Sequence, residues 1–238
     1  MIPLRDDNPS RITPLVTISL VVACVIVFVW QLSLGGRGDQ QATYSLGLIP
    51  SVLFGIHHLP PALVLVPPAA TIFTSMFLHG GWMHIIGNML YLWIFGDNVE
   101  EVLGAFRYLM VYLACGVVGS LFQIAGNPNS LVPTLGASGA IAGVMGAYVI
   151  WFPHNRVRVL VFQFITEMPA LLVIGLWIIM QVWEGFGSLG RLGEAGGVAY
   201  LAHVGGALTG IAVAFLFHDR AEYLRQMNEA REGWFSGP

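Results

Sequence analysis

The segment Gly136-Ala137-Ser138-Gly139-Ala140 opens an apolar, glycine-spaced stretch of the chain, and a second such stretch carries Ala202-His203 followed by Gly206 and Gly210. A polar side chain inside a bilayer is costly, by roughly 2.5 to 3.5 kcal/mol for a charged group on insertion scales. A serine and a histidine are also the residue types that form a nucleophile and its base. The two stretches therefore indicate chemistry carried out within membrane helices.

The composition is that of a membrane protein in one domain. The chain has 238 residues, of which 56% are hydrophobic and 10% are charged, and its mean hydropathy is +0.74. An ordinary soluble domain has about 25% charged residues. The net charge of -3 and the lack of a long basic run exclude nucleic-acid binding. Cys24 and Cys115 lie in apolar stretches and indicate no disulfide framework.

Six apolar stretches approach the ~20 residues needed to cross a bilayer. They are residues 13–34, 82–103, 108–125, 138–152, 169–186 and 200–217. Prolines interrupt the apolar runs of residues 35–80, and we expect this first loop to lie partly in the membrane interface. The loop formed by residues 126–136 should dip into the membrane where protein covers it. The sequence thus predicts an all-α membrane protein, a six-transmembrane-helix bundle with a long, partly membrane-embedded first loop.

The charges predict how these spans are oriented. Residues 1–12 and 219–238 read as tails around a six-span domain at 13–218, and all ten basic residues are arginines. Only Arg37 and Arg191 fall on the side opposite the termini, so the positive-inside rule places both termini in the cytoplasm. The apolar run after residue 11 is too long for a signal-peptide core. Short tails without a targeting extension favour a prokaryotic plasma membrane.

This orientation brings four polar residues to one depth. The second, fourth and sixth spans enter from the outer face, and each carries its polar residues within its first two turns: His84 and Asn88, Ser138, and His203. We expect these side chains to meet in the outer half of the membrane.

Ser138 has two interpretations. The free N–H groups and dipole of a helix start favour a developing oxyanion, but the same place suits a simple helix cap. The neighbouring Gly136 and Gly139 would permit close approach by a substrate backbone. A lone histidine in a span, such as His203, is often only a helix-to-helix hydrogen-bonding group.

Small-residue stripes favour the catalytic interpretation. Such stripes let two helices touch, which would bring the Ser138 hydroxyl and the His203 imidazole within hydrogen-bond reach. The stripes consist of Gly139 and Gly143 in one span and Ala202, Gly206 and Gly210 in the other.

His84 and Asn88 are four residues apart, on one helix face, and both can donate hydrogen bonds, as an oxyanion hole requires. A metal site built from His79, His84 and His203 is the alternative. The chain has no HExxH motif and no acidic residue near that level, so we expect neither a metal nor another cofactor.

The acids decide between a triad and a dyad. No carboxylate is an obvious third member, so the sequence predicts a Ser-His dyad whose histidine is oriented by packing or by another hydrogen bond. The Gly-x-Ser-x-Gly elbow of soluble hydrolases is not matched either, because Ala140 takes the last glycine position.

With these residues in place, the chain resembles the rhomboid family of intramembrane serine proteases over all six spans. The resemblance rests on three motifs: Gly136-Ala137-Ser138-Gly139, Ala202-His203-Val204-Gly205-Gly206 with Gly210, and the His79/His84/Asn88 spacing that continues to Phe95-Gly96 and Glu100.

The resemblance implies that Ser138 is the nucleophile and His203 the general base and then acid. It also implies that His84, Asn88 and the Ser138 backbone N–H hold the oxyanion, and that Gly136 shapes the adjoining loop. The implied substrates are single-span and other membrane proteins, cut near small residues in helix-destabilised segments from a water-filled cavity that opens outward. The oligomeric state is not predicted.

Further positions carry a family role or depart from it. By the same resemblance, Glu100 and His79 are structural. Many members have an aromatic residue four positions after the serine, where this chain has Ala142, so support for the His203 ring should come from Tyr200 or a neighbouring aromatic.

Two broader alternatives stay open, besides the choice between a movable cap and a plain loop for the glycine-rich residues 185–197. One is a rhomboid-like pseudoprotease that binds and escorts membrane clients. The other is a small-solute transporter, which would predict inverted repeats and a charged midplane site.

Overall fold

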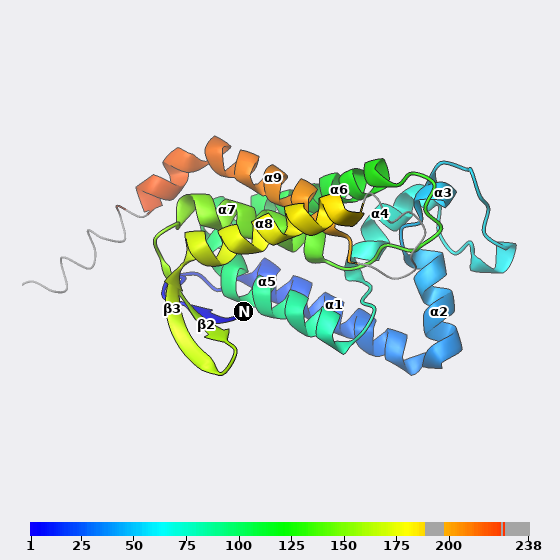
Figure 1. Cartoon of the computed structure of the whole chain (residues 1–238), viewed down its shortest axis with the longest axis horizontal. Coiled ribbons are helices and arrows are strands. Elements are labelled where there is room, and N and C mark those ends of the chain that lie inside the picture. The colour runs from blue at the N-terminus through cyan, green and yellow to red at the C-terminus, as the bar shows by residue number, and fades with distance from the viewer. Residues whose placement is uncertain (189–197, 225, 227–238) are drawn as a thin grey trace, which may run out of the picture.

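The computed structural model of the chain describes residues 1–188, 198–224 and 226. Its long helices lie along the long axis of the molecule (Figure 1). They are α1 (Leu15–Ser33), α5 (Trp82–Leu103), α6 (Ala105–Gly126), α7 (Ser138–Trp151), α8 (Ala170–Ser188) and α9 (Tyr200–Leu216). Each of the six predicted apolar stretches therefore coincides with one of these helices to within three residues at either end.

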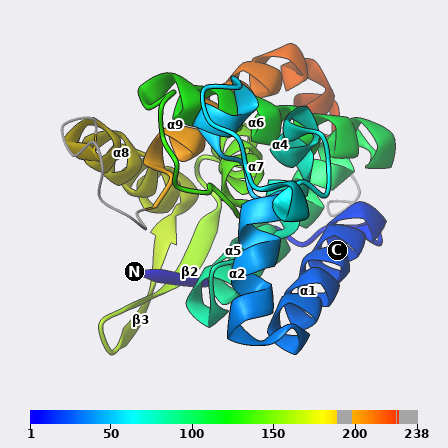
Figure 2. The same cartoon turned by 90° about the vertical axis from the view of Figure 1, so that its right-hand side faces the viewer.

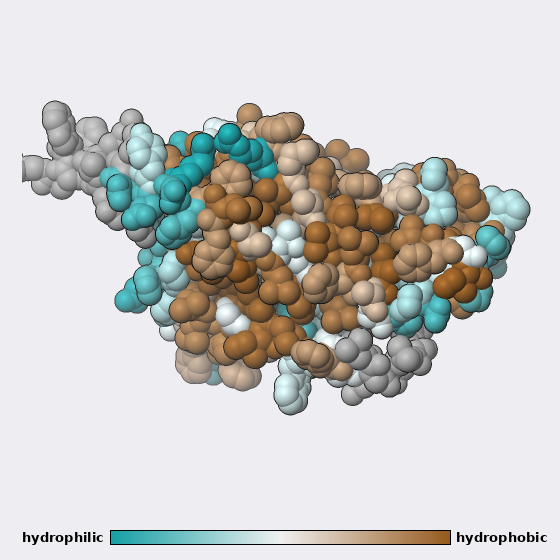
Figure 3. All heavy atoms as spheres, turned by 90° about the horizontal axis from the view of Figure 1, so that it is seen from above, coloured by the Kyte–Doolittle hydropathy of each residue, from teal (hydrophilic) through white to brown (hydrophobic). Residues whose placement is uncertain are grey.

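The number of membrane crossings stays a prediction. Among the described residues, three helices are long and apolar enough to cross a membrane, or up to five if each sharply bent helix pair is one span. Helix α7 has only 14 residues and falls below that length. In Figure 3, hydrophobic side chains cover the middle of the visible face and hydrophilic ones gather mainly toward its ends. The chain is an integral membrane protein.

The first loop contains short helical pieces. They are α2 (Gly35–Leu46), α3 (Pro50–Leu53), η1 (Pro61–Leu63), η2 (Pro68–Ala70), α4 (Thr71–Thr74) and η3 (Ser75–Phe77). Leu48 of this loop forms an isolated antiparallel bridge with Thr134, and the Gly136 N–H donates to the Ser75 carbonyl at 2.8 Å. The loop thus holds the segment that leads into Ser138.

The prediction of an all-α chain is wrong at one end of the bundle. Strands β1 (Ile2–Asp6), β2 (Arg156–Val161) and β3 (Phe164–Pro169) form an antiparallel sheet in the order β1-β2-β3, with Ile2 opposite Leu160 and Arg156 opposite Pro169. Five residues of the predicted N-terminal tail are therefore a strand.

The local reason for the sheet is an alternating pattern in β2. Val157 and Val159 are fully buried, while Arg156 and Arg158 point to solvent. Period-two alternation of this kind is a strand signal. Strand β1 has only five residues, of which Pro3 alone is buried, and it pairs with β2 along its length.

Helix α7 is the centre of the bundle, and Figure 2 shows it among the other helices. Nearly all of its residues are buried. A Cβ on Gly206 of α9 would overlap the carbonyl oxygen of Gly139, and one on Gly210 would overlap that of Gly143. The predicted packing of the two small-residue stripes is confirmed, and it brings the two backbones into direct contact.

Candidate active site

Ser138 and His203 meet where α7 and α9 begin. The Ser138 Oγ lies 2.7 Å from the His203 Nε2, and the imidazole is buried, with 6% of His203 exposed. The N-cap of α7 is Ala137, and no side-chain cap bond forms there. The Ser138 hydroxyl is thus hydrogen-bonded to the histidine, and the simple capping interpretation does not describe it.

The second ring nitrogen of His203 is also occupied. Its Nδ1 lies 2.6 Å from the Oε1 of Gln181 in α8. An amide oxygen can only accept, so Nδ1 carries the proton and Nε2 is left to accept the Ser138 proton. This is the tautomer that a general base needs.

Aromatic rings hold the imidazole from two sides. The Trp177 ring of α8 lies 5.5 Å from it at 32°, and the Tyr200 ring lies 6.5 Å away nearly edge-on. The expectation that Tyr200 or a neighbouring aromatic replaces the usual ring at Ala142 is confirmed, and Trp177 is the nearer and more parallel partner.

Gly136 brings the chain against His84 and Asn88. It has a φ of +117°, and a Cβ there would lie 2.5 Å from the His84 Nε2 and 3.6 Å from the Asn88 Nδ2. Only glycine fits a position with that backbone and that contact. The residue immediately precedes Ala137 and Ser138, so both donors face the loop at the start of α7.

Neighbouring groups orient both donors. The Gly80 N–H points at the His84 Nδ1 at 3.4 Å, which leaves the proton on Nε2, the atom beside Gly136. The Asn88 Nδ2 lies 3.0 Å from the His79 Nε2, and the His79 Nδ1 lies 3.2 Å from the Phe77 carbonyl. His79 therefore donates to Phe77 and accepts from Asn88, whose amide keeps a second N–H.

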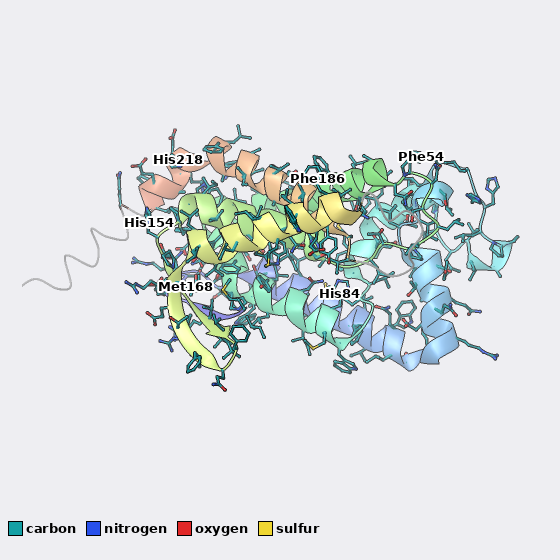
Figure 4. The ribbon with its side chains drawn as sticks, viewed as in Figure 1. Phe54, His84, His154, Met168, Phe186 and His218 are labelled. Carbon is teal, nitrogen blue, oxygen red and sulfur yellow. The ribbon has the colours of Figure 1, made fainter. Side chains whose placement is uncertain are left out.

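A small cavity opens beside Ser138. Most of the residues that line this cavity are small, and they come from several helices and from the loop before α7. The lining residues are Ser75, Met76, Gly116, Ser120, Thr134, Leu135, Gly136, Ser138, Gly139, Ala140, Ala199 and Ala202. Figure 4 shows His84 in the half of the bundle away from the sheet, while His154, Met168 and His218 mark the sheet end.

The metal alternative has no support in the part of the chain that the structure describes, where no group of three His, Cys, Asp or Glu side chains could hold an ion. His79 and His84 are edge-to-face neighbours with ring centroids 5.2 Å apart. The absence of a metal and of a cofactor stays a prediction.

Sequence reasoning missed Gln181 and Trp177. The signal was present, because Gln181 is the one polar residue in an otherwise apolar run from residue 170 to residue 183. The rule that singled out Ser138 and His203 applies equally to an amide inside a span. Most of the predicted cap, residues 189–197, lies outside the described residues, as do Arg191 and most of the C-terminal tail.

A comparison with protein families matches the rhomboid domain over residues 68–220. The chain belongs to the rhomboid family. The match covers more than half of the chain, and it includes α5, α6, α7, α8 and α9 with every residue of the candidate site.

Individual rhomboid relatives come from diverse organisms. The chain is 29% identical to the mitochondrial rhomboid protein 1 of Saccharomyces cerevisiae over 212 residues, which is 82% of this chain and 59% of the relative. It is 32% identical to the rhomboid protease GluP of Bacillus subtilis, over 59% of this chain and 24% of the relative.

A third relative is the human mitochondrial presenilin-associated rhomboid-like protein, 28% identical over 58% of this chain and 35% of the relative. The chain thus spans about 60% or less of the length of these rhomboids. Two of the three carry mitochondrial names, so a prokaryotic plasma membrane stays a prediction.

Proposed function

We propose that this rhomboid is an intramembrane serine endopeptidase that uses Ser138 and His203 as a catalytic dyad. The observation that carries the proposal is the 2.7 Å contact between the Ser138 Oγ and the His203 Nε2 in the tautomer that can accept a proton. A nucleophile within hydrogen-bond reach of an oriented base is the signature of covalent catalysis.

The first half of the reaction forms an acyl-enzyme. The Ser138 Oγ attacks the scissile carbonyl carbon while His203 Nε2 takes the hydroxyl proton. The His84 Nε2–H, the second Asn88 N–H and the Ser138 backbone N–H stabilise the oxyanion. When the tetrahedral intermediate collapses, the C–N bond breaks and His203 returns the proton to the leaving amine.

The second half regenerates the enzyme. A water gives its proton to His203 Nε2 and attacks the acyl carbon, and collapse of the new intermediate breaks the bond to Ser138 Oγ, which recovers the proton. The products are the two parts of the cut chain, and no redox partner or cofactor is needed.

The substrates are membrane proteins, with single-span chains as the simplest case. The cavity beside Ser138 is lined by Gly116, Gly139, Ala140, Ala199 and Ala202 among others, so it suits a small side chain next to the cut bond. A stable helix hides its carbonyls, so cleavage requires a segment that unwinds easily. With both termini in the cytoplasm, the site opens toward the outer face.

The alternative is a client-binding rhomboid without activity. Nothing in such a protein requires a serine and a histidine to share a proton, and this chain keeps both in bonding distance.

The test is cleavage of a single-span substrate by the purified protein in liposomes, with Ser138→Ala and His203→Ala compared with wild type. Each variant should lose cleavage by at least about 10³-fold, as triad deletions do. Ser19→Ala in α1 and His154→Ala at the sheet end make the same chemical changes away from the site and should keep wild-type rates. Equal cleavage by Ser138→Ala and wild type would refute the proposal.

A further inference from the structure

Helix α8 touches the candidate dyad through one polar side chain. Gln181 is largely buried, and its Oε1 lies 2.6 Å from the His203 Nδ1. The neighbouring α8 side chains Ile179 and Trp183 are mostly exposed on the outer surface of the bundle. The amide is therefore turned toward the histidine while the rest of this turn faces outward.

Both ring nitrogens of His203 are occupied in this arrangement. Nε2 faces the Ser138 hydroxyl and Nδ1 faces Gln181, so no ring N–H is left over for a carboxylate. In a serine-histidine-aspartate triad, the acid holds the imidazole in the correct tautomer and orientation. Gln181 occupies the place of that acid.

We propose that Gln181 is the positioning residue of His203, fixing the Nδ1–H tautomer and the ring angle through a neutral hydrogen bond. This inference rests on the proposed function, because it assigns Gln181 a part in the same reaction. A neutral acceptor suits a site of this kind, since an ionised carboxylate in apolar surroundings would carry a large desolvation penalty.

Trp177 supports the same role from one helical turn earlier. Positions four residues apart lie on the same helix face, and the Trp177 ring packs against the imidazole that Gln181 holds. One face of α8 thus supplies both a hydrogen bond and a ring contact. A rotation of α8 about its axis would remove both together.

The first experiment compares three variants of the full-length protein in the liposome cleavage assay. Gln181→Leu removes the acceptor at similar size, Gln181→Glu keeps an oxygen acceptor in either protonation state, and Gln163→Leu makes the same change at the exposed turn between β2 and β3. Thermal unfolding of each variant checks that it is folded.

For Gln181→Leu we expect kcat to fall by about 10- to 100-fold, by analogy with the range typical of lost hydrogen-bond partners behind metal-bound histidines. KM should stay within about twofold of wild type, because the bond orients the base and does not touch substrate. Gln181→Glu should recover most of kcat, and Gln163→Leu should match wild type. Wild-type kcat in Gln181→Leu, or equal losses with Leu and Glu, would overturn the positioning role.

A second measurement needs no activity and separates this inference from the proposed function. In the Ser138→Ala background with ¹⁵N-labelled histidine, the ring ¹⁵N shifts report which nitrogen of His203 carries the proton, and loss of the signal in His203→Gln assigns it. We expect the proton on Nδ1 with Gln181 present and a shift toward Nε2 in Gln181→Leu.

The two measurements together distinguish the failures. If wild type cleaves nothing while the proton moves as expected, the proposed function fails and the hydrogen-bonding role of Gln181 stands. If wild type cleaves its substrate and Gln181→Leu leaves the protonated nitrogen of His203 unchanged, the function stands and the positioning role is wrong.

Discussion

The two ends of α7 both contact buried polar groups, and they use them differently. At its first residue, Ser138, His203 and Gln181 form a chain of hydrogen bonds that contains no carboxylate. Near its other end, Tyr148 donates to the Asp6 carboxylate of β1 at 2.6 Å, and the same end of the bundle holds the buried Glu100.

Both carboxylate oxygens of Glu100 accept hydrogen bonds from the start of α1. Its two oxygens accept from the Val16 N–H at 2.9 Å, from the Thr17 N–H at 2.8 Å and from the Thr17 hydroxyl at 2.9 Å, so it caps the start of α1 from another helix. Glu100 and Asp6 therefore join elements at the sheet end, while the candidate dyad is oriented by an amide. Changes at the two ends should separate activity from stability.

Of the changes that compare the two ends of α7, Gly136→Ala should give the largest effect, and it should appear in activity. The new methyl group would sit 2.5 Å from the His84 Nε2 at a backbone φ of +117°, so the loop and the His84 ring, one of the proposed oxyanion donors, must move apart. Loss of one such donor typically lowers kcat by about 10²- to 10³-fold. The measurement is steady-state cleavage in liposomes.

Gly55→Ala is the matched control. Gly55 also has a positive φ, +67°, but a Cβ there meets nothing within 4 Å. Alanine there must also adopt a positive φ but makes no close contact, so its kcat should stay at the wild-type level. Equal kcat losses in the two variants would mean that strain alone explains the result and that Gly136 has no special relation to His84.

The site end was the part that sequence could predict. Ser138, His203, His84 and Asn88 are polar residues in apolar helices, and the spacing of small residues was enough to predict which helix faces touch. Backbone-to-backbone packing of this kind is encoded by glycine positions, which are visible in one sequence.

The hydrogen-bond partner of His203 and the β-sheet were harder to predict. The partner of His203 depends on how α8 is rotated, and Gln181 is the one polar residue in the apolar run from residue 170 to residue 183 of that helix. The sheet was not predicted because β1 has only five residues and its pairing with β2 joins residues more than 150 positions apart. Long-range pairing of a segment without its own periodicity leaves no local signal.

Glu100→Gln should give the next largest effect, and it should appear in stability. The amide keeps one accepting oxygen and turns an NH₂ group toward the N–H groups of α1, so at least one buried donor loses its partner. We expect a cost of about 3 kcal/mol in the free energy of unfolding. Denaturant unfolding in mixed micelles measures it, and kcat of the folded protein should be unchanged.

Glu101→Gln provides the comparison for Glu100. Glu101 accepts from the Arg11 N–H at 3.2 Å in an exposed setting, and such surface changes usually stay within about 0.5 kcal/mol. If Glu100→Gln lowered kcat while leaving unfolding unchanged, the separation between a structural end and a catalytic end would fail.

Asp6→Asn should give the smallest effect, visible only in the pH dependence of stability. Burial raises the pKa of the Asp6 carboxyl to about 6, against the opposing effect of the Tyr148 hydrogen bond. The native state therefore binds more protons than the unfolded state between about pH 4 and pH 6, so this carboxyl lowers stability as the pH rises through that window. Above about pH 6, the Asp6 carboxyl is ionised in both the folded and the unfolded state, so its destabilising effect no longer changes with pH.

Asparagine is neutral throughout and can still accept from Tyr148. The Asp6→Asn protein should therefore lose less stability than wild type between pH 4 and pH 6, and its Tm should be the higher of the two at pH 7. Thermal unfolding at several pH values measures both, with Asp219→Asn, an exposed aspartate near the C-terminal end of α9, as the control. A wild-type slope in Asp6→Asn would show that the Asp6 carboxyl is solvated in the folded state, so that Glu100 would be left as the acid that this end of the bundle shields from water.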